Sequence, residues 1–188
     1  MNKISLQKPY YLIYPRHVVL IVSQADENSN PNVMTAAWSS YVSIKPPIFS
    51  ICITQSRYTY KLIQKSKQFT INVPTIDLIK ETFYFGSVSG RNINKFEHVD
   101  LTLSKGEKIF TPIINECISH FECKVVNQVK MGDHYVIFGE ILANYTDENV
   151  LKNGFFDLSN IKLIYHCGGN KFTTNSNEII EVEKWWNK

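Results

Sequence analysis

The chain has 188 residues, of which 44% are hydrophobic and 20% charged, so it can bury one sizeable core, and we expect a single domain over residues 1–188. Its 20 Lys and Arg residues against 17 Asp and Glu leave a net charge of +3, and no segment concentrates the basic residues, so a nucleic-acid partner is not expected. The sequence contains no secretory leader pattern and no run of 18 uncharged apolar residues. We therefore expect a cytoplasmic protein without a membrane partner.

Six stretches rich in β-branched and aromatic residues, each bounded by turn formers, are typical of strands. They are His17–Ser23, Val33–Ile44, Ile48–Thr54, Gln68–Val73, Cys117–Val129 and Tyr135–Tyr145. Residues 130–133 separate the last two stretches and supply a turn, which predicts a long antiparallel hairpin.

Two helices are expected between the strands. The first covers about Tyr58–Lys65, with Ser56 at the position of the N-cap. The second follows Pro74, and Leu78, Ile79, Thr82 and Phe83 recur at helical spacing. Helices and strands do not alternate as βαβ units require, so we predict a mostly β fold, an antiparallel barrel with peripheral helices. Residues 173–188 are expected to form a C-terminal tail, either docked or partly mobile.

The usual catalytic motifs are missing. Residues 86–90 resemble a GxSxG nucleophile elbow, but the central residue is Val88. Neither a GxGxxG fingerprint nor a P-loop is present, and the histidines and cysteines have no metal-ligand spacing, so no metal is expected. The four cysteines should be reduced, and Cys52, between two isoleucines, is interpreted as a small buried hydrophobic residue without a redox role.

Three segments have the composition of a ligand site. Residues 54–59 join a strand to a helix and offer free backbone N–H groups, two hydroxyls and a guanidinium to a phosphate. Residues 87–96 form a glycine-bearing polar loop with two cations, which suits an anion. Residues 32–40 place small residues in mid-strand, where a flat ligand can approach the backbone. Taken singly, each segment also has a structural interpretation: a helix cap beside a solvated Arg57, a surface loop, and a core filled by Met34 and Trp38.

Taken together, six segments resemble the flavin reductase-like proteins of flavoredoxin type, in order and spacing, over roughly Tyr14 to Phe172. These segments are Asn32–Trp38, Lys45–Pro47, Ser56–Thr59, Phe69–Pro74, Ser89–Arg91 with Lys95–Phe96, and Gly132–His134. The turn His166–Gly169, followed by Phe172, is similar to the C-terminal aromatic turn of the family.

The resemblance implies a split barrel that binds FMN, usually as a homodimer with the flavin near the subunit interface. It implies that residues 32–38 lie along the isoalloxazine ring, that Ser56, Arg57 and Thr59 hold the phosphate, and that Ser89, Gly90 and Lys95 close over the ribityl phosphate. It also implies that His134 approaches the flavin from its own or the partner subunit and tunes it. The cofactor-binding residues implied are Asn32, Met34, Thr35, Ala36, Trp38, Ser56, Arg57, Thr59, Ser89, Gly90, Lys95, His134 and Phe172.

Two functions from different classes follow. The first is a flavin-dependent redox protein that passes electrons or hydride through non-covalently bound FMN, either as an NAD(P)H:flavin reductase or as a flavoredoxin-like carrier with a reduced electron-transfer protein as donor. The second is a non-redox barrel module that binds a phosphorylated ligand or single-stranded RNA through the same loops.

Overall fold

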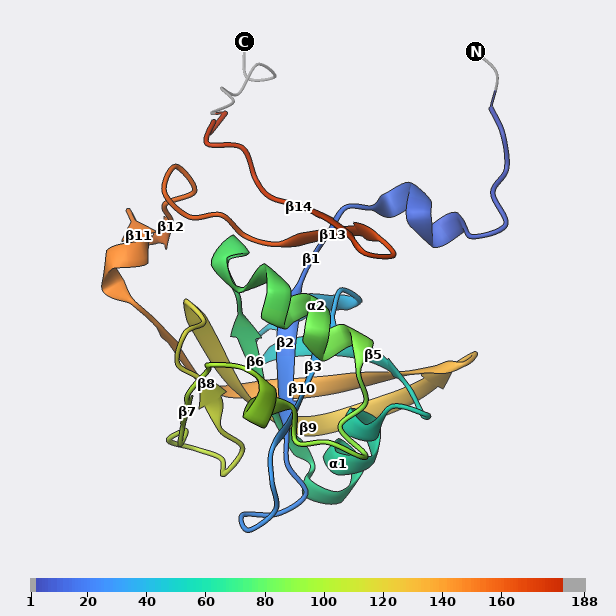
Figure 1. The fold of residues 1–188 in the computed structure, drawn as a ribbon, viewed down its shortest axis with the longest axis vertical. Coiled ribbons are helices and arrows are strands. Elements are labelled where there is room, and N and C mark those ends of the chain that lie inside the picture. The colour runs from blue at the N-terminus through green and yellow to red at the C-terminus, as the bar shows by residue number, and fades with distance from the viewer. Residues whose placement is uncertain (1–2, 181–188) are drawn as a thin grey trace.

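The structure, a computed structural model, describes residues 3–180, and a sheet of seven antiparallel strands dominates it (Figure 1). The strand order is β3-β2-β6-β9-β10-β5-β4. The strands are β2 (Val19–Ser23), β3 (Asn32–Ala36), β4 (Ser39–Ile44), β5 (Pro47–Thr54), β6 (Gln68–Val73), β9 (Ser119–Met131) and β10 (His134–Thr146). The predicted hairpin is confirmed, because β9 and β10 pair from His134↔Met131 to Thr146↔Ser119.

The sheet curls into a barrel that stays split between its two edge strands. β3 and β4 end the hydrogen-bonded order on opposite sides, yet only Ala37 and Trp38 separate them in the chain. Two edges joined by two residues can only meet if the sheet bends round on itself. The prediction of one strand over Val33–Ile44 is wrong, because the chain turns a corner where the backbone O of Trp38 accepts from the N–H of Cys52.

The hydrophobic core consists of two clusters, and β2 contributes side chains to both. All five residues of β2 are buried, because both faces of the strand are covered. Val19 and Ile21 point into the barrel, whereas the alternate residues Leu20 and Val22 pack outside it with Phe85 of helix α2 (Ile79–Ser87). The single predicted strand His17–Ser23 is also interrupted, since β1 (Arg16–His17) belongs to another sheet. The sequence therefore positions α2 over the face of the sheet that carries β2 and β3 (Figure 1).

The two predicted helices are present. Helix α1 covers Tyr58–Ser66, one residue beyond its predicted end, and the short 3-10 helix η2 (Ile76–Leu78) leads into α2. The prediction that Ser56 caps α1 is wrong: Arg57 is the N-cap residue, and the Ser56 hydroxyl lies 3.0 Å from that of Thr54. The local turn, in which the N–H of Arg57 donates to the O of Thr54, contains Ser56 and leaves Arg57 directly before the helix.

A small sheet of β1, β13 (Tyr165–Gly168) and β14 (Lys171–Thr173) lies at the end of the molecule that also holds both ends of the described chain (Figure 1). Next to it lies the 3-10 helix η1 (Pro9–Ile13). Asn175 fastens the start of the predicted tail, because its amide accepts from the N–H of Leu163 and donates to the O of Ile161. The rest of that tail, residues 181–188, lies outside the described residues.

The remaining elements are short. They are β7 (Leu103–Ser104) with β8 (Ile113–Ile114), β11 (Leu151–Lys152) with β12 (Phe155–Phe156), η3 (Lys95–His98) and η4 (Glu148–Val150). Within residues 3–180, none of the helices has the length and apolar character needed to cross a bilayer.

Candidate functional site

Two adjoining cavities, of about 300 and 250 Å³, lie beside β3, between the start of α1, the end of α2, the start of β10 and the hairpin β13–β14. Both are lined by Met34, Thr35, Thr54, Arg57 and Gly86, so together they form one elongated site. We call the larger one the aromatic cavity and the smaller one the polar cavity. All thirteen residues predicted from the sequence line one of the two or both.

The polar cavity contains the N-terminus of α1. No side chain caps this helix, so its first N–H groups point toward the cavity without a side-chain acceptor. Ser56, Arg57 and Thr59 line the cavity at that point. Backbone N–H groups at a helix start favour an anion, and the guanidinium of Arg57 adds a positive charge.

Asn32 and Thr59, which both line the polar cavity, are hydrogen-bonded to each other. The amide Nδ2 of Asn32 donates to Oγ1 of Thr59 at 2.9 Å, and both residues are buried. The Oδ1 atom of Asn32 is buried without a hydrogen-bond partner. A Cβ atom on Gly90 would lie 1.9 Å from that Oδ1, so only glycine fits here. An unpaired buried acceptor is costly, so a hydrogen-bond donor placed beside Oδ1 would stabilise the site.

The side chain of Lys95 is more buried than that of a cation in a typical surface loop. The sequence suggests a surface loop, but the side chain is buried, and Nζ donates to the O of Val33 at 2.7 Å and to the O of Phe85 at 2.8 Å. Burial, together with the charge of Arg57, lowers the pKa of Lys95 to about 8. An ammonium has three N–H donors, and two are committed to the backbone. The third donor and the charge remain for an anion in the cavity that Lys95 lines.

Arg91 fastens the loop around Gly90 to the start of α1. Its guanidinium donates to the O of Ser56 at 2.7 Å and lies 5.7 Å from the ring centre of Tyr58. The backbone N–H of Arg91 donates to the hydroxyl of Ser89 at 3.4 Å. The two segments that the sequence analysis treats as separate anion loops therefore form one wall.

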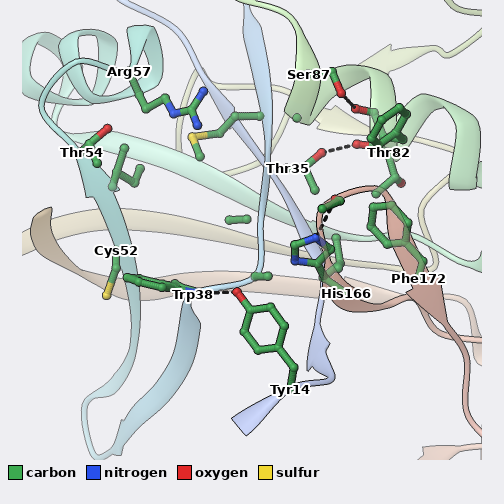
Figure 2. A pocket seen from close by; sticks show the side chains of 18 of the residues that line it. Tyr14, Thr35, Trp38, Cys52, Thr54, Arg57, Thr82, Ser87, His166 and Phe172 are labelled. Atoms are coloured by element: carbon green, nitrogen blue, oxygen red, sulfur yellow. Dashed lines mark hydrogen bonds between the residues drawn. The ribbon is translucent and has the colours of Figure 1, made fainter. Parts of the chain in front are cut away.

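The aromatic cavity is built around Trp38 (Figure 2). The His134 ring stacks on the indole, with ring centres 5.0 Å apart and planes inclined by 29°. Asp133 accepts from Nδ1 of His134 at 2.8 Å, which leaves Nε2 as the other hydrogen-bonding atom of the ring. Because Trp38 and His134 belong to the same chain, this cavity contains His134 without a second subunit.

Residues that the prediction did not include complete the aromatic cavity. Tyr14 accepts from Nε1 of Trp38 at 3.1 Å, and Thr82 accepts through its backbone O from the hydroxyl of Thr35. The ring of Phe172 packs against the rings of both His166 and Phe83. These residues come from the segment after η1, from α2 and from the small sheet, which no local pattern links to β3. Only the family-like turn at His166–Gly169 could have drawn attention to one of them.

Cys52 corrects a further expectation. It is half-buried rather than fully buried and lines the aromatic cavity near Trp38 (Figure 2). It lies on β5, where alternate residues face the barrel core and the cavity, so Ile51 and Ile53 take the buried positions. Burial raises the pKa of the Cys52 thiol, which keeps it protonated. All four cysteines are free, as predicted.

Comparison with known proteins identifies the family of the chain. The family model described as "Flavin reductase like domain" matches residues 11–173. The chain belongs to the flavin reductase-like family. An uncharacterized protein of Archaeoglobus fulgidus is 41% identical over 170 residues, which is 90% of this chain and 93% of that protein.

Two further relatives have names that state a function. The structure of flavoredoxin from Desulfovibrio vulgaris (Miyazaki F) superimposes with a TM-score of 0.86 at 28% identity and covers 100% of both chains. A protein of Streptomyces globisporus named "NADH-dependent FAD reductase" is 28% identical over 116 residues, 61% of this chain and 63% of that protein. The predicted family and the predicted split-barrel fold are thus confirmed.

Proposed function

We propose that this protein is a flavin-dependent oxidoreductase of flavoredoxin type that holds FMN without a covalent bond. The observation that carries the proposal is the continuity of the two cavities. A polar cavity with three features suited to an anion opens, past Thr35 and Arg57, into an aromatic cavity suited to a flat ring. FMN has a phosphate at one end and a flat ring at the other.

The polar cavity fits the phosphate and the ribityl chain. The start of α1, Arg57 and the third donor of Lys95 would bind the phosphate, and the Thr59 hydroxyl, which accepts from Asn32, keeps its own proton for it. The free Oδ1 of Asn32 would accept from a ribityl hydroxyl. Ser89 and Gly90 would cover the chain from the other side.

The aromatic cavity fits the ring. Bound FMN would supply the redox chemistry, by accepting and releasing electrons or hydride. β3 from Met34 to Ala36 would support the ring, and Trp38 would shape the pocket and exclude water. His134, held by Asp133, would place a hydrogen-bond donor beside the ring and favour the reduced form.

The donor in this proposal is NAD(P)H or a reduced electron-transfer protein. NADH is supported by the name of the Streptomyces globisporus relative. A nicotinamide needs no Rossmann domain here, since it can stack directly on an exposed flavin face.

Reconstitution tests the proposal. The apoprotein is titrated with FMN, FAD and riboflavin, and binding is followed by flavin fluorescence. We expect yellow protein and tightest binding of FMN, because riboflavin lacks the phosphate and FAD carries a second nucleotide beyond it. Equal affinity for riboflavin and FMN would overturn the phosphate assignment. A colourless protein that takes up no flavin would favour the non-redox module instead.

We also propose a homodimer, with the partner's chain packed on the split edge of the barrel. Edge strand β4 exposes Tyr41, Val42 and Ile44, the last with 77% of its surface accessible. Leu12 and Ile13 of η1, 66% and 62% accessible, are also exposed. Apolar residues on an open edge strand mark a contact surface, and a second copy would cover it.

A further inference from the structure

The hydroxyl of Tyr14 has a proton with no acceptor among residues 3–180. It accepts a hydrogen bond from Nε1 of Trp38 at 3.1 Å, and an indole N–H can only donate. The hydroxyl proton of Tyr14 must therefore point elsewhere. Tyr14 lines the aromatic cavity, and in Figure 2 its ring lies at the end of the pocket away from Arg57.

The neighbours of Tyr14 form a wall of flat side chains. The ring centre of His166 is 5.5 Å from that of Tyr14 and 5.2 Å from that of Phe172. Nε2 of His166 lies 3.0 Å from the backbone O of Gly169, so it donates there, and the ring is held in place. Phe83 extends the wall beyond Phe172, with ring centres 6.1 Å apart.

We infer that Tyr14 is a ligand-binding residue that donates a hydrogen bond to the carbonyl oxygen of a flat conjugated molecule in the aromatic cavity. A flat molecule would stack against this wall, and its oxygen would accept a hydrogen bond from the Tyr14 hydroxyl. The inference rests on the proposed function and deepens it, because such a molecule would lie beside the flavin. Two sources share this chemistry: the nicotinamide carboxamide of a donor, and a conjugated aldehyde or ketone as acceptor.

The test compares matched ligands that differ in the carbonyl. Nicotinamide is paired with 3-methylpyridine for the donor, and benzaldehyde with toluene for the acceptor. Binding of each to FMN-saturated protein is measured by ligand-observed NMR. Tyr14→Phe removes the hydroxyl and keeps the ring. Tyr11→Phe is the control, because Tyr11 lies on η1, directly before Tyr14 in the fold, but outside both cavities.

We expect the wild type and Tyr11→Phe to prefer the carbonyl ligand of at least one pair, and Tyr14→Phe to lose roughly 2- to 13-fold of that preference, the range of one hydrogen bond. Loss in the nicotinamide pair assigns Tyr14 to the donor, and loss in the benzaldehyde pair assigns it to an acceptor. Equal weakening of both members of every pair would mean that Tyr14 only supports Trp38 and would overturn the inference. So would no weakening at all.

Titration of the same samples with FMN separates this inference from the proposed function. If Tyr14→Phe binds FMN like the wild type and keeps the carbonyl preference, the inference fails and the proposed function stands. If the wild type takes up no FMN, the proposed function fails, and the inference fails with it.

Discussion

The indole of Trp38 and the imidazole of His134 stack 5.0 Å apart, although 96 positions separate them in the sequence. Trp38 stands at the corner between the two edge strands, and His134 begins β10 opposite Thr54. The antiparallel pairing of β5 with β10 brings the hairpin turn to the open side of the barrel. One wall of the aromatic cavity therefore depends on sheet register.

We predict that His134→Ala keeps the fold and most of the bound FMN, but lowers the flavin midpoint potential and slows reduction by the donor. The reason is the loss of a donor that would stabilise the negative charge gained by the reduced ring. Spectroelectrochemistry and stopped-flow reduction measure the two effects. His98→Ala, a histidine outside both cavities, is the control. An unchanged potential together with an unchanged rate would leave His134 with a structural role alone.

Thr59→Val should weaken FMN binding by about 1–3 kcal/mol, because the charged phosphate loses one donor while the side chain keeps its shape. Riboflavin affinity, measured in parallel, corrects for the lost contact between Thr59 and Asn32. A loss of the same size for both flavins would place the phosphate away from Thr59.

FMN affinity should fall as the pH rises above about 8. The pKa of Lys95 in the free protein is about 8, and a bound phosphate would raise it. Below that pH, Lys95 is already charged in both states and its contribution is complete; above it, binding must take up a proton, at a cost of up to about tenfold in affinity per pH unit. Titration of the protein with FMN at each pH measures how the affinity changes. Parallel titration with riboflavin, which lacks the phosphate, corrects for effects that do not involve the phosphate. Lys95→Met should bind FMN more weakly, and its affinity should not fall in this way as the pH rises. A wild-type affinity for FMN that stays the same from pH 7 to 9.5 would contradict the prediction.

Gly90→Ala should reduce FMN affinity and thermal stability together. The added Cβ would meet Oδ1 of Asn32 at 1.9 Å, so either the loop or the buried amide must move. Thermal melting and FMN titration report the two losses. In the double variant with Asn32→Ala the amide is gone, and we expect the stability to recover in part while binding stays weak. A Gly90→Ala protein with wild-type melting and binding would show that the loop shifts freely.

Ile44→Glu should shift the protein from dimer to monomer. A charge at the most exposed apolar position of β4 would have to lose its water in the proposed interface. Light scattering measures the mass, and one chain weighs 21.7 kDa. Glu148→Gln, a change on the exposed helix η4, is the control. A wild-type mass of a single chain with FMN bound would refute the homodimer.

Local patterns determined most of the main strands, both α-helices and the ligand segments, but not the breaks in the strands predicted over 17–23 and 33–44. β-branched alternation identifies β6 and the hairpin of β9 and β10, because the strand period is a property of neighbouring residues. The order of six short segments, together with the turn at His166–Gly169 and Phe172, identified the family and thirteen residues that line the site. Each of those residues lies on or beside a segment whose composition is already unusual.

Tertiary structure decided what those residues do to one another. The burial of Lys95 depends on the carbonyls of Val33 and Phe85, which come from two other elements. The corner at Trp38 exists because the sheet closes on itself, and Tyr14, the residue that follows η1, reaches the cavity from outside the barrel. Contacts between segments far apart in the chain have no signature in a single sequence, since each segment alone would serve equally well as core or surface.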